Sequence, residues 1–243
     1  MRLKVADMVD RLHVIIDDVK RTDGDDDFSE DKDTELREAL LTGAEQVTGA
    51  APRSVLVPKA VAAGLAIDGD YDYDAAQTEY TDGHGAVMIP DDWLRLYELK
   101  LRSWSGTVTT LMDSESDEAK MQASRWSRGT PQKPKAMLGY DDEGRRVVVY
   151  WTAGRYAKYG TALDSVYDHK IDRFLYVPKP DFETETTTIT KEGGKTESTS
   201  TEYLNIPLTE SCEKAVLYRA AGVFMEAKKE STLAEKFYAL GQL

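Results

Sequence analysis

Cysteine is nearly absent from this chain of 243 residues, which contains only Cys212. A single thiol excludes an internal disulfide and any metal cluster built from several cysteines, and it fits synthesis in a reducing cytoplasm. Long apolar runs are missing too, so the sequence predicts no membrane-spanning helix. Residues 1–20 carry charges throughout, a pattern that does not fit a secretory signal peptide.

Basic residues are scarce relative to acidic ones. The chain has 31 Lys and Arg against 44 Asp and Glu, which gives a net charge of −13. Proteins that bind duplex nucleic acid need a basic surface, so this balance argues against ordinary DNA binding. The apolar fraction of 41% is nevertheless large enough for a folded core.

The charges are unevenly distributed along the chain. Residues 17–35 hold ten acids and three bases, whereas residues 120–160 hold nine bases and three acids. Two solvated faces would explain this asymmetry. Alternatively, the acidic part of one subunit meets the basic part of the next, and head-to-tail contacts of this kind close rings.

Signatures of catalysis are missing from the sequence. It contains no Gly-x-Ser-x-Gly elbow, no phosphate-binding glycine loop and no His-Glu-x-x-His motif. The histidines, His13, His84 and His169, do not pair at the spacing of metal ligands. Cys212 has no histidine nearby, which favours packing within a buried helix.

Two acidic segments have part of the spacing of a calcium loop. One begins at Asp23 and the other at Asp68, but Phe28 and Tyr73 stand where such a loop needs glycine. Solvated loops are the simpler interpretation. We therefore predict no catalytic, cofactor-binding or metal-ligating residue, and no cofactor; an acid–base enzyme hidden among the carboxylates is the alternative.

Both ends of the chain have the apolar spacing of amphipathic helices. The pattern predicts a helix over residues 4–20, a second from about residue 33 to Pro52, and two more within 210–240 that separate near Glu230. The apolar stripes consist of Val5, Met8, Val9, Leu12, Ile15, Ile16 and Val19; Leu36, Leu40, Ala44 and Val47; Ala215, Tyr218, Ala221, Gly222 and Met225; and Leu233, Phe237 and Leu240.

The middle of the chain favours strands. We expect a turn over 81–85, a strand over 86–89, an extended segment that ends near Trp104, and a short helix over 117–126. Residues 135–140 and 145–151 flank a turn and predict a hairpin, and another strand is expected over 171–177. Residues 55–57 could be a short extended piece, and residues 60–66 helix or loop.

Residues 182–204 form the most distinctive segment. Threonine and glutamate dominate two arms on either side of Gly193-Gly194, which predicts a long β-hairpin with two polar faces. An isolated ribbon of this composition is marginal in water. We interpret it as an arm that pairs with a neighbouring subunit or the next ring; a surface loop without a role is the alternative.

Together these patterns predict an α+β fold. Residues 1–66 and 205–243 would form a helical bundle, residues 67–181 a central β-rich domain, and residues 182–204 an extended hairpin arm.

Trp93, Trp104, Trp126 and Trp151 could line a sugar-binding face, but their positions in or beside β segments favour core packing or subunit contact.

The segment Gly85-Ala86-Val87-Met88-Ile89-Pro90-Asp91-Asp92-Trp93-Leu94-Arg95-Leu96 resembles head-to-tail adaptor proteins of short-tailed phages, also called tail tubular or ring proteins. Similar short motifs cover most of the chain, and the long hairpin is closest to ring proteins of crAss-like phages. The short motifs are Ala44 to Arg53, Trp104 with Val108, Met121-Gln122, Trp126, Gly129-Thr130-Pro131 and Lys135 to Gly139.

This resemblance implies a structural virion protein rather than an enzyme. Its subunits would form a ring, usually of twelve copies, between the portal protein and the downstream tail proteins. The ring would be assembled in the bacterial cytoplasm and lie in the neck of the virion, and genome DNA would pass through its lumen without specific binding. An acidic lumen would repel phosphate, in keeping with the net charge of −13. A carbohydrate- or protein-binding module is the alternative function.

Overall fold

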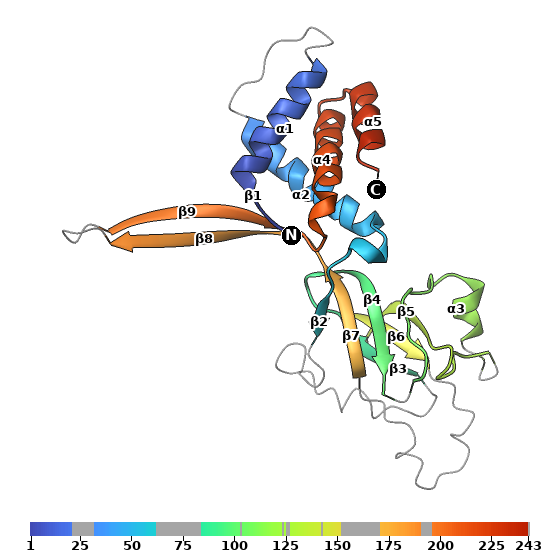
Figure 1. The fold of residues 1–243 in the computed structure, drawn as a ribbon. Coiled ribbons are helices and arrows are strands. Elements are labelled where there is room, and N and C mark those ends of the chain that lie inside the picture. Colours follow the sequence, from blue (N-terminus) through green and yellow to red (C-terminus); the bar gives the residue numbers. More distant parts are fainter. Residues whose placement is uncertain are drawn as a thin grey trace. The chain divides into compact units, whose positions relative to one another are not determined.

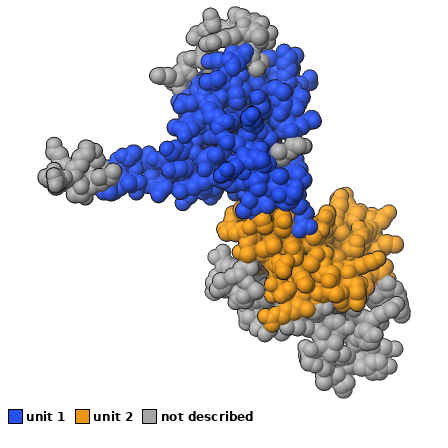
Figure 2. All heavy atoms as spheres, in the orientation of Figure 1, with its two compact units in different colours: residues 1–57, 179–243 blue, residues 58–178 orange. Residues whose placement is uncertain are grey.

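A computed structural model describes most of the chain, namely residues 1–20, 32–61, 84–102, 104–122, 124, 127–141, 143–151, 171–190 and 196–242. The described residues combine α-helices with three small antiparallel sheets of three strands each. They divide into two compact units, residues 1–57 with 179–243 (unit 1) and residues 58–178 (unit 2), coloured separately in Figure 2.

Unit 1 contains four α-helices, α1 (Val5–Lys20), α2 (Asp33–Ala50), α4 (Glu213–Ala227) and α5 (Ser231–Leu240). Helix α4 packs against the other three, and α1 also contacts α2 (Figure 1). The predicted helices are therefore present close to their expected limits. Burial confirms most of the apolar stripes, and the fully buried members include Leu12, Ile16, Leu36, Leu40, Ala44, Ala221 and Met225.

Two glycines allow the close approach of these helices. A Cβ atom at Gly43 of α2 would lie 2.7 Å from the backbone nitrogen of Ala220 in α4. At Gly222 of α4 it would lie 2.4 Å from the ring of Tyr238 in α5. Both distances are shorter than real contacts. A side chain at Gly43 would push α2 and α4 apart, whereas one at Gly222 would displace the Tyr238 ring. One stripe was misjudged at its end, because Leu240 is 59% exposed in the last turn of α5.

The β part of unit 1 is a sheet in the order β1-β9-β8, formed by β1 (Arg2–Lys4), β8 (Asp181–Thr190) and β9 (Thr196–Asn205). The predicted hairpin is thus present, and each of its strands extends one residue further at the base. Strand β1 was not predicted, because three residues before a helix give no periodic signal. The extended piece expected at 55–57 is present only in part. Val55 belongs to a 3-10 turn, η2 (Arg53–Val55), and Leu56 forms an isolated antiparallel bridge with Leu208.

Unit 2 holds two sheets with the orders β2-β7-β4 and β3-β6-β5. The strands are β2 (Lys59–Val61), β3 (His84–Met88), β4 (Trp93–Leu101), β5 (Lys135–Tyr140), β6 (Arg146–Trp151) and β7 (Ile171–Pro178). Their inner faces share a core that includes Val87, Leu99, Tyr150 and Phe174. The predicted extended segment, hairpin and later strand are confirmed.

Three expectations for unit 2 change. The turn expected over 81–85 already belongs to β3 at His84 and Gly85, because β6 extends far enough for Trp151 to pair with His84. The short helix α3 ends at Met121 (Asp117–Met121). Residues 59–61, which the sequence analysis grouped with the helices, form β2 and pair with β7 in unit 2. No helix in the described part of the chain is long and apolar enough to cross a membrane.

Candidate assembly surface

The hairpin β8–β9 is the strongest candidate for a functional surface. Ten residue pairs join its strands without a register shift, from Asp181 opposite Asn205 to Thr190 opposite Thr196. Threonine favours the extended backbone, because its branched Cβ fits the pleated surface of a strand. Figure 1 shows the hairpin running away from the four helices as a two-stranded ribbon.

One face of the hairpin base is held by Arg2 of β1. Its guanidinium lies 3.1 Å from a carboxylate oxygen of Glu185 and 3.5 Å from one of Glu183. The same group lies 3.9 Å from the centroid of the Tyr203 ring. Since β1 pairs with β9 only at Tyr203, Leu204 and Asn205, these contacts fix the base and leave the rest of the ribbon free of β1.

The opposite face of the base packs on the helices. Leu204 is completely buried, and α1 contacts β9. Arg37 of α2 pairs with Glu202 and lies 4.6 Å from the centroid of the Phe182 ring. Sequence reasoning missed both arginines, because their partners are more than 140 residues away in the chain. The base of the hairpin therefore belongs to unit 1.

Beyond the base, the described side chains of the ribbon form no apolar face. Residues 183–188 and 198–200 are exposed, so neither side of this part is covered by unit 1. On one face, the hydroxyl oxygens of Thr186 and Ser200 lie 3.3 Å apart and those of Thr188 and Ser198 lie 3.4 Å apart. Thr187 and Thr199 are paired on the other face. The outer ribbon is therefore an extended surface of hydroxyl groups.

The edges of the ribbon are open to further pairing. Strand β8 ends its sheet, so within the described residues every second residue turns its backbone N–H and C=O away from β9. Edge strands are usually blunted by lysine, proline or a bulge. Strands β8 and β9 contain no lysine, arginine or proline, and their pairing has no bulge. The ribbon thus offers backbone groups that another strand can bind.

The charged segments give weaker support for a contact between subunits. Most of the acidic segment 17–35 lies outside the described residues. In the basic segment, Lys120 lies 3.5 Å from Asp117, Lys135 pairs with Glu118, and Arg145 lies 2.7 Å from Asp141. Since these bases already have acidic partners in their own unit, less charge remains to attract another subunit.

The segment that carries the family resemblance has a structural role in unit 2. An Asp92 carboxylate oxygen accepts a hydrogen bond from the Tyr176 hydroxyl at 2.7 Å, and the other lies 2.9 Å from the Lys59 ammonium. The Trp93 ring stacks on that of Tyr176, with 5.8 Å between centroids. Asp92 and Trp93 therefore join the turn before β4 to β2 and β7.

These contacts also shift the pKa values of the three groups. Burial alone would raise the pKa of the Asp92 carboxyl, but the hydrogen bonds from Lys59 and Tyr176 outweigh it and hold that pKa below its ordinary value. The hydrogen bond to Asp92 raises the pKa of Lys59. Burial and the same carboxylate raise the pKa of Tyr176. The carboxylate is thus the charge that organises the cluster.

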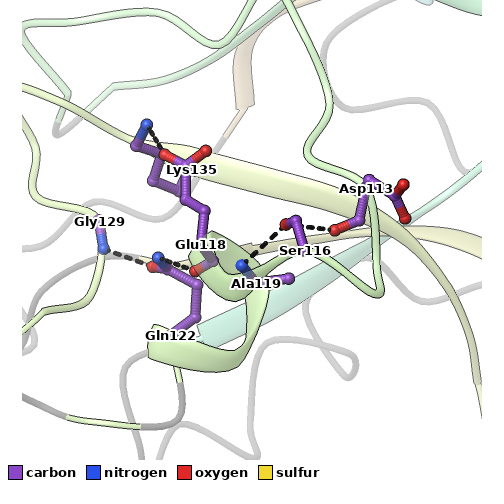
Figure 3. A network of polar contacts seen from close by, with 7 residues as sticks. All are labelled: Asp113, Ser116, Glu118, Ala119, Gln122, Gly129 and Lys135. Carbon is purple, nitrogen blue, oxygen red and sulfur yellow. Dashed lines mark hydrogen bonds and ion pairs between the residues drawn. The ribbon is translucent and has the colours of Figure 1, made fainter.

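A second polar network joins other motifs of the resemblance (Figure 3). Ser116 caps α3 by accepting a hydrogen bond from the backbone of Ala119 at 3.1 Å. The buried Gln122 side chain donates to the Glu118 carbonyl at 2.9 Å and accepts from the Gly129 N–H at 2.8 Å. Gln122 and Gly129, which belong to two of the quoted motifs, are therefore direct partners. The network stabilises a loop, and its hydrogen bonds to backbone groups have a structural role.

The remaining candidate residues lie apart from one another. The Nε2 atom of His13 is 3.0 Å from an Asp33 carboxylate oxygen, His84 starts β3, and His169 is outside the described residues. Cys212 is a buried free thiol, which confirms its predicted packing role. The first acidic loop is described only from residue 32 onward, and the second lies outside the description. The residues that are described contain no cluster of three or more possible metal ligands.

Three of the four tryptophans lie within the described residues, and none of these three forms a surface for sugar. Trp93, Trp104 and Trp151 are buried in unit 2, which confirms the predicted core packing for these three, and Trp126 lies outside the described residues. No family model and no curated protein matches the chain.

Proposed function

We propose that the chain is a subunit of a phage head-to-tail adaptor, a structural protein without a catalytic centre. Its copies form a ring, of twelve subunits in the family it resembles, between the portal protein and the downstream tail proteins. The ring is assembled in the bacterial cytoplasm and becomes part of the virion neck. Genome DNA passes through its lumen, and the net charge of −13 supports passage without binding.

The observation that carries this proposal is the open hairpin on a folded base. Its base is fixed by Arg2 and Arg37, while its outer part is exposed on both faces. Fixing a long ribbon in this way costs conformational entropy and buries little apolar surface in the subunit itself. A neighbouring subunit that pairs with the ribbon would recover this cost through backbone hydrogen bonds.

The finer architecture is part of the same proposal. The four helices would act as a bundle that packs side by side with those of neighbouring subunits, and unit 2 would form a β-rich collar. The alternative, a carbohydrate-binding module, has less support, because three of the four tryptophans are buried and an exposed aromatic platform is what sugar binding needs.

Electron microscopy of the purified protein, alone and mixed with the portal protein of its phage, tests the proposal. We expect annular particles with a central channel that dock on the portal ring. Particles no larger than a single subunit under both conditions would contradict it, because an adaptor acts only as part of a ring.

A further inference from the structure

The two outer edges of the hairpin differ from each other. Strand β8 is the last strand of its sheet over its full described length. The outer edge of β9 is covered by β1 at residues 203–205 and has no partner strand over 198–202. One hairpin thus presents two non-equivalent edges, a β8 edge that is open over its described length and a shorter β9 edge.

We propose that hairpins of successive subunits pair edge to edge, β8 of one copy with β9 of the next, so that the arms of the ring form a closed antiparallel β-barrel. This inference rests on the proposed ring and names the contact that closes it. The partner recognised by the hairpin is therefore a second copy of this chain.

Strand direction fits this arrangement. When two hairpins lie side by side and point the same way, β8 of one runs outward while β9 of the next runs back, so the new pair is antiparallel like the pair within each hairpin. Because the two edges differ, each contact is head-to-tail, and a rotation that closes leaves no unpaired edge. A symmetric dimer would instead use the same edge twice and leave the other edge open.

The two polar faces of the ribbon indicate water on both sides. A strand that packs on a protein core has one apolar face, and a barrel in a membrane has an apolar outer face. The outer hairpin has neither, since its exposed residues on both faces are threonine, serine and glutamate. A barrel with a wide, water-filled lumen is the closed β structure in which neither face needs to be apolar.

The distribution of acids permits the pairing. If the sheet continues between copies in the register that joins β8 to β9 within one copy, Thr184 faces Glu202 and Glu185 faces Thr201 of the next copy. No glutamate then faces another glutamate, so the contact avoids direct like-charge repulsion. Strand β1 ends its pairing at Tyr203, and the neighbouring β8 would occupy the edge from Glu202 outward.

Cysteine cross-linking between copies tests this contact. Thr187→Cys and Thr199→Cys variants are purified separately under reducing conditions and mixed before assembly; the rings are then isolated by size and oxidised. Each variant has one exposed cysteine, because the native Cys212 is buried. Strand partners are close enough for a disulfide, so we expect a severalfold excess of disulfide-linked dimer in the mixture over either variant alone. Thr201→Cys replaces Thr199→Cys to detect a barrel staggered by two residues.

The matched control is Thr188→Cys mixed with Thr199→Cys, since these side chains lie on opposite faces of the ribbon. Rings that give no more dimer in either test mixture than in this control would overturn the barrel and leave the ring proposal standing. Failure of the unmodified protein to form rings would instead contradict the proposed function itself.

Discussion

At the scale of single residues, Asp92 connects three segments of unit 2. Its two carboxylate oxygens contact Lys59 of β2 and Tyr176 of β7. Because Asp92 and Trp93 lie in the segment that resembles phage adaptors, that resemblance coincides with a network that holds strands together. The contacts of Asp92 and Trp93 therefore explain their part in the fold of unit 2 and do not by themselves indicate a partner.

Replacing this carboxylate should weaken unit 2 in a pH-dependent way. The pKa of Asp92 is lowered from 3.8, so its stabilising effect is complete above the unfolded-state value and is lost as pH falls through the folded-state value. Asp92→Asn should lower the free energy of unfolding by roughly 0.5–1.5 kcal/mol at pH 7, and the difference from the native protein should shrink below about pH 4.

Tryptophan fluorescence during urea unfolding measures this effect, because all four tryptophans lie within residues 58–178. The neighbouring exposed residue provides the control, and Asp91→Asn should leave the transition almost unchanged. A loss for Asp92→Asn that is equally large at about pH 3 and pH 7 would show that the carboxylate charge is not responsible.

Glycine at position 43 should be essential to the contact between α2 and α4. In Gly43→Ala, the new methyl group would lie 2.7 Å from backbone atoms of Ala220, which cannot move without shifting α4. We expect the free energy of unfolding to fall by about 1–3 kcal/mol. Far-UV circular dichroism at 222 nm follows this transition, since unit 1 contains the four long helices.

Gly49 in the same helix is a matched control. A Cβ atom there meets no other atom within 4 Å, so Gly49→Ala should leave the stability unchanged or raise it by up to about 1 kcal/mol. Helix propensity favours alanine over glycine at both positions, so equal losses for the two variants would contradict the close approach at Ala220 as the cause of the Gly43→Ala effect.

At the scale of elements, repeating apolar patterns predicted helices and longer strands, but strands of three residues could not be predicted. The stripe of Leu36, Leu40 and Ala44 repeats over several turns, and α2 lies where that stripe predicts it. Strands β1 and β2 have three residues each and take their structure from partners more than 100 residues away. No local propensity encodes such pairings, so sequence reasoning missed them.

The candidate surface shows the same limit. Alternating threonine and glutamate around Gly193-Gly194 predicted the hairpin and its polar faces. The clamps made by Arg2 and Arg37 at its base were not predictable, because each arginine is adjacent to the hairpin only after folding. The sequence therefore predicted the hairpin but not the contacts that hold its base.

Removing the outer hairpin should separate folding from assembly. A variant in which residues 184–201 are replaced by a short Gly-Ser turn retains Phe182, Leu204 and the pairing of β1 with the base of β9. Because the deleted residues described here are mostly exposed, we expect the subunit's melting temperature to change little, while ring formation or docking fails.

Thermal melts followed by circular dichroism and the mass of the assembled particles provide the two measurements. Unfolding of the subunit after the deletion would place the outer ribbon in the core. Rings that assemble as before would show that the ribbon is not an assembly arm.

At the scale of the whole molecule, the chain has two compact units, and unit 1 includes the open ribbon. The charged segments first indicated a head-to-tail contact, but several bases of the segment 120–160 are paired within unit 2. Backbone pairing between hairpins depends less on ionic strength than contacts between exposed charges. Rings closed by the hairpins should therefore persist when salt is raised from about 0.1 M to about 1 M.

Mass photometry of the purified chain, alone and with its portal protein, is the most direct test of whether the subunits form a ring. The account predicts a discrete species at an integer multiple of the subunit mass of 27.2 kDa, free or bound to the portal. A single population at the mass of one subunit, at every protein concentration and with the portal present, would contradict the ring and with it the proposed adaptor function.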